Sequence, residues 1–309
     1  MHPLRLRENM VNGMTNRLLA LGEVLWDVFD QSTRLGGAPL NLSAHARRLG
    51  YEALLISAVG NDELGDRTMA KMADLGLNTT FVQRTSQFET GTARVELGLG
   101  DQTRFVISRP AAYDSVDISG EQVKQIQDWG PGWFYFGTLF SQRPEGKAVL
   151  DRLLEALPVC TKFYDLNLRP GGDSAELVGE LLARADVVKL NEEELQTVHK
   201  AMGLPAAKEQ FCREGLKRYG WSAVCVTLGE RGCAMLSGGE YTEAEGYAVH
   251  VADTVGAGDA FAAAFLHGLV SKWHVARIAA FANRLGALVA SRPGAIPDWD
   301  LHEVVQIAR

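Results

Sequence analysis

The sequence contains little cysteine, because only four of its 309 residues are of this type. No two of them form a Cys-x-x-Cys pair, and their spacing does not match a zinc site. Because structural disulfides belong to oxidising compartments, this pattern predicts reduced thiols and a cytoplasmic protein. A chain of this length buries roughly 75% of its unfolded surface, so its core needs no crosslink. The four residues are Cys160, Cys212, Cys225 and Cys233.

Long apolar runs are also absent. No run reaches the ~18 residues that a membrane helix needs, so we expect no association with a membrane. Arginines precede the apolar stretch 18–21, but that stretch is too short for the core of a signal peptide. Residues 1–13 are predicted to be a disordered tail, with Met14 as an alternative start.

Basic residues are fewer than acidic residues, so the formal net charge is −7. This balance argues against a nucleic-acid partner, because binding to a phosphate backbone depends on many basic side chains. It does not exclude a small anionic ligand, because the backbone amides at a helix N-terminus bind phosphate without any net positive charge.

Several signatures of common enzyme classes are missing from the sequence. The chain has no GxxxxGK[ST] phosphate loop and no GxGxxG after its first apolar strand, which argues against the common nucleotide and dinucleotide folds. It has no GxSxG motif of an α/β-hydrolase and no HExxH motif of a zinc enzyme.

Apolar runs alternate with helical patterns along the chain. Near-continuous apolar strands separated by helices predict a mostly parallel sheet covered on both faces, in one α/β domain over residues 14–309. The strands are expected at 18–24, 53–59, 133–136, 163–166, 187–190 and 223–227, and the helices at 39–49, 62–75, 146–157, 175–184 and 206–219.

One region interrupts this alternation. Residues 92–97 and 103–107 form short strands that mix polar and apolar side chains, and the glycine-rich segment between them predicts a hairpin loop. Since a hairpin cannot sit inside a parallel sheet without breaking it, we expect a separate small lid, formed by about residues 27–37 and 88–110.

The clearest motif is DTVGAGD at residues 253–259, followed by an apolar segment that predicts a buried helix over 259–270. Gly256, Ala257 and Gly258 allow a tight turn that exposes successive N–H groups, and such a helix start binds anions. Asp259 places a carboxylate at the same point. Two explanations stay open, because Asp259 is either a general base for a hydroxyl that attacks phosphorus or a cap of the helix.

Two motifs near the N-terminus also place polar groups beside an element end. Gly36 and Gly37 permit close approach of the backbone, and Asn41 lies in the first turn of the next helix, where asparagine is locally unfavourable. Asp27 follows the carboxyl end of a strand, where ligands bind in open α/β sheets. Its carboxylate suits two neighbouring sugar hydroxyls. Each motif alone is more often an ordinary turn or a solvated loop.

Polar residues follow two later strands. Asn191 and Glu194 predict a capping box, although an acid at this sheet edge could also help to hold hydrated Mg²⁺. Thr227 and Gly229 follow the next strand and either line a nucleotide pocket or form a turn.

Taken together, the motifs resemble the ribokinase-like (PfkB) family of sugar kinases, from about residue 18 to residue 297. GGAPLNLSAHARRLG is similar to the N-terminal signature of the family, and DTVGAGDAFAAAF to its C-terminal signature. AVGNDELGD, DLNLRP, KLNEEEL, VTLGERG and FANRLGALVASRPGAIP also fall in the family's order. The resemblance implies a central α/β sheet, a small β-sheet lid, and ATP-dependent phosphorylation of a sugar hydroxyl.

The resemblance also implies a role for each motif. Asp259 would be the base, and Gly256, Ala257 and Gly258 would stabilise charge on the transferred phosphoryl group. The sugar would be held by Asp27, Gly36, Gly37, Asn41, Asn167 and Arg169. The nucleotide would contact Asn191, Thr227, Gly229 and Asn283, and Glu194 would hold Mg²⁺ through water. A monovalent cation, K⁺, would bind at Asp253, Val255, Val289, Arg292, Gly294 and Asp298.

Within the family, GEVLWD and DLNLRP are most similar to bacterial fructokinases, which implies phosphorylation of fructose at O6. The D-x-N-x-R pattern is shared with 2-keto-3-deoxygluconate kinases, in which case Arg94, Arg104 or Arg109 would meet the carboxylate of a sugar acid. Ribokinase, nucleoside kinase and a non-catalytic sugar sensor remain further alternatives. The lid hairpin offers an edge for a homodimer.

Overall fold

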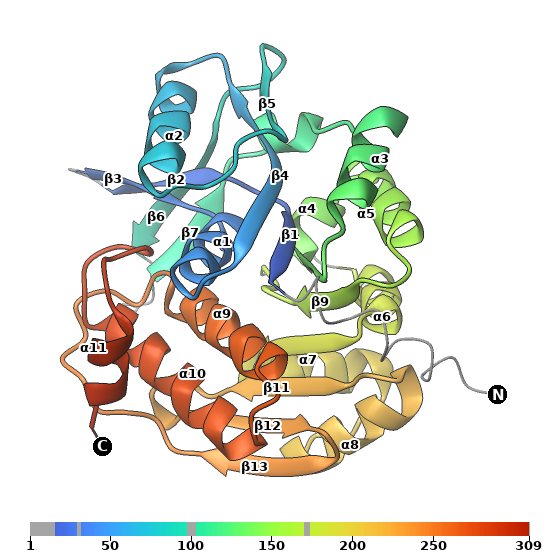
Figure 1. Cartoon of the computed structure of the whole chain (residues 1–309), viewed down its shortest axis with the longest axis vertical. Helices are drawn as coiled ribbons and strands as arrows, with labels where there is room; N and C mark the ends of the chain where they lie inside the picture. The colour runs from blue at the N-terminus through green and yellow to red at the C-terminus, as the bar shows by residue number, and fades with distance from the viewer. Residues whose placement is uncertain (1–15, 30–31, 98–102, 170–173, 309) are drawn as a thin grey trace.

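The computed structural model describes residues 16–29, 32–97, 103–169 and 174–308, with the side chains of 95–97 and 103–105 excepted (Figure 1). The expected tail at residues 1–13 lies outside the described residues. Two sheets are present, a large one and a small one.

The large sheet has nine strands in the order β13-β12-β11-β10-β9-β8-β1-β4-β5. Its neighbours from β11 to β5 all pair in parallel, which confirms the expected mostly parallel sheet. The strands are β1 (Arg17–Leu21), β4 (Glu52–Gly60), β5 (Val82–Thr85), β8 (Trp133–Gly137), β9 (Thr161–Asp165), β10 (Val187–Asn191), β11 (Ala223–Thr227), β12 (Cys233–Ser237) and β13 (Glu240–Ala244).

The last two strands at one end of the sheet, β12 and β13, were missed by the sequence analysis. They pair antiparallel with β11 and with each other. Gly238 and Gly239 join them with positive φ angles of 61° and 84°, which suit the tight turn of a two-residue hairpin. The Gly-Gly pair was therefore the available signal for this hairpin.

The small sheet has the strand order β3-β2-β6-β7. It consists of β2 (Leu25–Phe29), β3 (Ser32–Gly36), β6 (Gly91–Leu97) and β7 (Thr103–Ile107). The hairpin β6–β7 is antiparallel, as predicted, and it lies outside the large sheet beside β2 and β3. Figure 1 shows this sheet beyond α1, on the side of the molecule where α2 lies.

Helices cover both faces of the large sheet. Each strand points its side chains alternately to the two faces, so an apolar core lies on each side of the sheet. Leu18 and Ala20 of β1 belong to one apolar cluster, and Leu19 and Leu21 belong to the other. The first cluster includes α1 (Ala38–Arg48), α2 (Glu63–Asp74), α9 (Ala257–Val270), α10 (Val275–Ala290) and α11 (Leu301–Gln306). The second includes α3 (Gly120–Trp129), α4 (Thr138–Ser141), α5 (Pro144–Ala156), α6 (Ala175–Arg184), α7 (Glu192–Met202) and α8 (Lys208–Tyr219).

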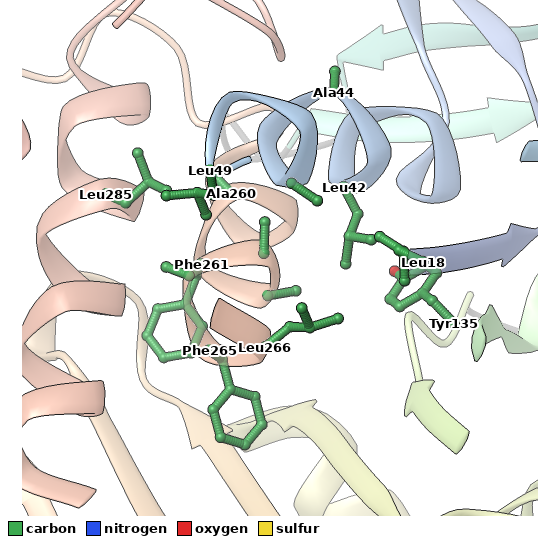
Figure 2. Close-up of a cluster of buried hydrophobic side chains, with 14 of the residues drawn as sticks. Leu18, Leu42, Ala44, Leu49, Tyr135, Ala260, Phe261, Phe265, Leu266 and Leu285 are labelled. Carbon is green, nitrogen blue, oxygen red and sulfur yellow. The ribbon is translucent and has the colours of Figure 1, made fainter. Parts of the chain in front are cut away.

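Helix α9 lies at the centre of the first cluster, packed between α1 and α10 (Figure 2). Its small residues Ala262–Ala264 are fully buried, and they allow the two neighbouring helices to approach closely. Phe265 packs edge-on against Phe163 of β9, with ring centroids 5.7 Å apart. The predicted buried helix is confirmed, although it begins at Ala257 rather than at residue 259. No helix within the described ranges is long and apolar enough to span a membrane.

The packing of α9 predicts that Phe265→Ala lowers the free energy of unfolding by about 3–5 kcal/mol, because it leaves a cavity in the core. Val305→Ala is the control, because Val305 on α11 is 63% exposed and its truncation removes little packing. Urea denaturation of both variants measures the difference. Equal effects of the two substitutions would contradict the central position of α9.

Candidate active site

A cavity of about 220 Å³ opens between the small sheet and the N-terminus of α9. It lies at the carboxyl ends of the parallel strands, where open α/β sheets bind their ligands. The sequence predicted most of its polar lining. The residues that line it and were predicted for the sugar or phosphoryl group are Asp27, Gly37, Asn41, Asn167, Arg169, Gly256 and Asp259. Val255, predicted for a cation, also lines it, and the others are Glu23, Leu25, Ala38, Ala93, Ile107 and Thr254.

Asp259 lies in the first turn of α9 and reaches into this cavity. Gly256 occupies the N-cap position, and Asp259 forms no capping bond with its carboxylate. Instead, Oδ2 of Asp259 accepts a hydrogen bond of 2.8 Å from Nδ2 of Asn41 on α1. Burial raises the pKa of Asp259 to about 7, and the Asn41 bond opposes this shift. This carboxylate is therefore poised to exchange a proton near neutral pH.

The turn before α9 presents unbonded backbone amides. Gly256 has φ 78°, and a Cβ atom there would lie 2.5 Å from Cα of Ala295, so no other residue fits without a shift. Among the described residues, the amides of Gly256 and Gly258 have no hydrogen-bond partner, whereas that of Ala257 donates to the carbonyl of Thr254 at 3.3 Å. Two of the three predicted amides are thus free to bind an anion at the positive end of the helix.

The paired glycines before α1 allow a backbone carbonyl and one carboxylate to approach the chain closely. A Cβ atom on Gly37 would lie 2.4 Å from the carbonyl oxygen of Glu23, and one on Gly36 would lie 3.0 Å from Oδ2 of Asp27. Burial raises the pKa of Asp27 to about 6, although Arg169 opposes this shift. Asp27 lines the cavity, but it lies in the middle of β2 of the small sheet and not, as expected, after the carboxyl end of a strand. Gly36 is not part of the lining.

Glu23 is a cavity residue that the sequence analysis missed. It is 5% exposed, and its Oε1 accepts a hydrogen bond of 3.3 Å from the amide of Ala38. Burial raises its pKa, against the opposing effects of Arg169 and Arg109. Glu23 stood in the quoted motif GEVLWD, and an acid within an apolar strand pattern was the available signal.

Two amide side chains in the cavity have buried polar atoms without a partner among the residues that the structure describes. They are Oδ1 of Asn41 and Nδ2 of Asn167. Asn167 also has φ 46°, a conformation that is uncommon outside glycine and often occurs at functional sites. An unpaired buried polar atom destabilises the protein, so both atoms favour a polar ligand in the cavity.

Neither Arg94 nor Arg109, two of the three arginines expected to meet a sugar acid, lines the cavity in the described residues. Arg109 is held by Asp114, the carbonyl of Leu139 and Gln142. Arg94 is exposed, and the side chain of the third, Arg104, lies outside the described part of the structure. Arg169, which was expected to hold the sugar, does line the cavity.

A buried ion pair behind the base was also missed by the sequence analysis. Nζ of Lys189 on β10 donates to both carboxylate oxygens of Asp165 on β9, at 2.8 and 3.0 Å. The hydroxyl of Tyr135 donates to Oδ2 of Asp165 at 3.1 Å. Burial disfavours the ammonium, but Asp165, Glu194 and Asp259 together raise the pKa of Lys189. A permanent positive charge thus lies close to the base and the free amides.

The residues expected to contact a nucleotide line the sheet edge outside this cavity. Asn191 and Thr227 are paired neighbours at the ends of β10 and β11, and Gly229 follows with φ 63°. Nδ2 of Asn283 donates to the carbonyls of Ala244 and Glu245, at 3.3 and 3.2 Å. The amide nitrogen of Asn283 is therefore occupied in holding the end of β13.

Glu194 forms the capping box that its spacing predicted. Its Oε2 accepts from the amide of Asn191 at 2.7 Å, while the amide of Glu194 donates to Oδ1 of Asn191 at 2.8 Å. Its Oε1 accepts from the amide of Leu168 at 2.8 Å. Each oxygen keeps one lone pair, which fits an Mg²⁺ ion held mainly by water and phosphate. In the described ranges, no group of three or more histidine, cysteine or acidic side chains forms a metal site by itself.

Three of the six residues expected to bind a monovalent cation, Asp253, Val289 and Asp298, use acceptor atoms within the protein. Oδ1 of Asp253 accepts from the amide of Val255 at 3.0 Å, and Oδ2 accepts from the amide of Gly294 at 3.1 Å and from Arg34. The carbonyl of Val289 accepts from the amide of Arg292 at 3.0 Å, and the guanidinium of Arg292 occupies the carbonyl of Asp298. With the guanidinium of Arg34 on its carboxylate, Asp253 does not fit the expected role of a K⁺ ligand.

Comparisons with known proteins find relatives over nearly the whole chain. Residues 8–301 match the pfkB family carbohydrate kinases. The chain is 28% identical to a fructokinase of Escherichia coli over 303 residues, which cover 92% of this chain and 96% of the relative. A solved structure of a fructokinase with bound ATP from Xylella fastidiosa is 25% identical, covers 95% of this chain and 98% of that one, and has a TM-score of 0.82.

A 2-dehydro-3-deoxygluconokinase structure from Thermotoga maritima has the same TM-score of 0.82 at 22% identity. The alignment covers 94% of this chain and 98% of that one. At 22% identity, this likeness shows a shared fold alone.

The raised pKa of Asp259 predicts that Asp259→Asn stabilises the free protein more at pH 8 than at pH 4.5. The folded protein holds this proton up to pH about 7, and the unfolded chain only up to ~4, so the wild type loses stability as the pH rises between them. The neutral asparagine avoids this loss, on the order of 1–3 kcal/mol.

Thermal unfolding across this pH range measures the difference between the two proteins. Asp66→Asn is the control, because the side chain of Asp66 is 72% exposed. A gain by Asp259→Asn that does not change with pH would contradict the raised pKa.

Proposed function

Because the chain belongs to the pfkB family of carbohydrate kinases, we propose that it transfers the γ-phosphoryl group of ATP to O6 of fructose. The enzyme is a phosphotransferase that acts on a sugar hydroxyl. The identity of the sugar and the roles of the individual residues are part of the proposal. The fructokinase relatives in Escherichia coli and Xylella fastidiosa support fructose and, through the bound ATP of the latter, the phosphoryl donor.

One observation carries the proposal: a carboxylate with a raised pKa and two free backbone amides meet at the end of one cavity. A hydroxyl beside Asp259 would lose its proton to the carboxylate as it attacks phosphorus. Charge that develops on the transferred group would then face the amides of Gly256 and Gly258. Base and anion-binding group are thus positioned by the same turn, without a phosphate-binding loop.

The charge at Lys189 supports the same assignment. Its ammonium is held by Asp165, so it adds a fixed positive potential behind the amides of the anion site. Mg²⁺ bound with ATP would supply neutralising charge at the phosphates, and Glu194 would orient it through water. Asn191, Thr227 and Gly229 would contact the nucleotide at the neighbouring sheet edge.

The rest of the cavity suits a polyhydroxylated ligand. Asp27 would accept hydrogen bonds from two sugar hydroxyls, Oδ1 of Asn41 would accept another, and Nδ2 of Asn167 would donate one. A volume of about 220 Å³ is below the roughly 300–1,000 Å³ that is typical of drug-sized ligands. The cavity is therefore better matched to a monosaccharide than to a nucleoside.

A second substrate is favoured by one specific observation. Arg169 lines the cavity, and its guanidinium could bind the carboxylate of 2-keto-3-deoxygluconate in a bidentate manner. Glu23 and Asp27 lie in the same cavity and would repel that carboxylate, which is why fructose is preferred here. A cytoplasmic location and a homodimer through the lid remain predictions.

The proposal predicts ADP release with fructose and Mg·ATP, and a loss of at least ~10³-fold in kcat for Asp259→Asn with retained ATP binding. A coupled assay would compare fructose, 2-keto-3-deoxygluconate, ribose, fructose 6-phosphate and nucleosides. Faster turnover with 2-keto-3-deoxygluconate would overturn the fructose assignment. Sugar binding without ADP release across the panel would indicate a sensor instead of an enzyme.

The pKa of Asp259 predicts the pH dependence of the reaction. Since the base works as the carboxylate, kcat/KM for the sugar should fall about tenfold per pH unit below pH about 7 and be constant above it. Asn41→Ala removes a hydrogen bond that stabilises the carboxylate, so it should move this limb to higher pH. If the acid limb of the pH profile of Asn41→Ala stays in place while its kcat/KM falls, Asn41 acts in sugar binding alone.

A further inference from the structure

Arg34 connects the small sheet to the turn that forms the anion site. It lies on β3, directly opposite Asp27 of β2 in the antiparallel pair. Its Nη1 donates to Oδ2 of Asp253, which precedes the Gly256 turn in the sequence. The two side chains are 219 positions apart in the chain, so this ion pair exists only in the folded protein.

The Arg34 ion pair would act on the turn at Gly256 through Asp253. Its carboxylate accepts from the amide of Val255, one residue before Gly256, and from the amide of Gly294 in the loop that follows α10. The side chain of Asp253 is 12% exposed. With Arg34 removed, this nearly buried carboxylate would keep two backbone donors but lose its opposite charge.

The loop at 294–298 packs directly against the anion-site turn. The Cβ position on Gly256 would lie within 3 Å of three atoms of Ala295. Nε2 of His45 contacts the carbonyl of Ala295 at 3.0 Å, and Nδ1 of His45 accepts from the indole of Trp299 at 3.0 Å. The imidazole of His45 therefore carries its proton on Nε2.

Two further arginines hold the same loop. Arg48 donates to the carbonyl of Pro297 and pairs with Asp298 at 2.6 Å. Arg292 occupies the carbonyl of Asp298 and pairs with Glu303. Of the residues expected to bind a cation, Asp253 and Asp298 thus both pair with guanidinium groups of this chain.

We propose that Arg34 is a positioning residue that takes the place of a monovalent cation: its guanidinium neutralises Asp253 and joins the small sheet to the anion-site turn. The inference rests on the sugar-kinase function. Two consequences follow. The reaction proceeds at full rate without K⁺, and the position of Gly256 depends on a charge carried by the sheet that also carries Asp27.

A mobile surface pair would not have these consequences, because exposed ion pairs contribute little. Arg34 differs from such a pair in two ways. Its partner is nearly buried, and the guanidinium also lies over the ring of Phe29, with Cζ 5.0 Å from the ring centroid, which restricts its orientation.

The test compares Arg34→Met and Arg34→Lys with the control Arg67→Met. Arg67 is an exposed arginine that also reaches the small sheet, where it donates to the hydroxyl of Thr33 at 3.1 Å rather than to a carboxylate. ADP release at saturating sugar and Mg·ATP would be measured in tetramethylammonium chloride and in KCl of equal ionic strength.

The wild-type rate should change less than about twofold between the two salts. Arg34→Met should lose about 10–100-fold in kcat, because a displaced anion site misplaces the reacting groups. Arg34→Lys should keep much of the rate, because it retains the charge. Added guanidinium or K⁺ should restore part of the rate of Arg34→Met and leave Arg67→Met unchanged.

A second measurement does not depend on turnover. The thermal midpoint of the free wild-type protein should be the same in both salts, whereas K⁺ should raise that of Arg34→Met. Activation or stabilisation of the wild type by K⁺ would overturn the proposal, as would an Arg34→Met variant that behaves like Arg67→Met. If no sugar supports ADP release in either salt, the proposed function fails, and the thermal measurement still decides the role of Arg34.

Discussion

The active site is dominated by carboxylates that are buried at one point, where the large sheet, the small sheet and the start of α9 meet. Asp27 and Asp259 have raised pKa values because burial disfavours their charged forms. Asp165, which is fully buried nearby, is balanced by Lys189. The remaining acids face amide groups and an open cavity. Such a site needs a ligand that brings hydrogen-bond donors, and a sugar has several.

The helix that carries Asp259 also forms the centre of one core. Ala260, Phe261 and Phe265 of α9 are buried between α1 and α10, while Asp259 lies one residue before this segment (Figure 2). Because the core cannot shift without losing packing, the position of the carboxylate relative to Asn41 of α1 is defined by the same contacts that stabilise the fold.

The small sheet contributes to both halves of the site. Asp27 on β2 faces the cavity, and Arg34 on the paired strand β3 reaches the carboxylate of Asp253 beside the anion-site turn. The negative net charge of the chain is compatible with an anionic co-substrate, because the backbone amides at the start of α9 can bind an anion without a basic surface.

The sequence by itself determined the alternation of strands and helices, the separate hairpin, and most of the polar residues of the cavity. These features are local, since apolar periodicity and glycine-rich turns lie within a few residues of each other. It missed the β12–β13 hairpin, although Gly238 and Gly239 were a signal for it. It also missed Glu23 and Lys189, because a charged residue in an apolar run gives no indication of its partner.

Only the tertiary structure decided which polar groups act together. Asn41 meets Asp259 across 218 positions of the chain, and Arg34 meets Asp253 across 219. The second contact bears on the expected cation site, because the guanidinium of Arg34 occupies the carboxylate of Asp253. Hydrogen bonds over such separations depend on how α1, α9 and the small sheet pack, and no local pattern in the sequence encodes that packing.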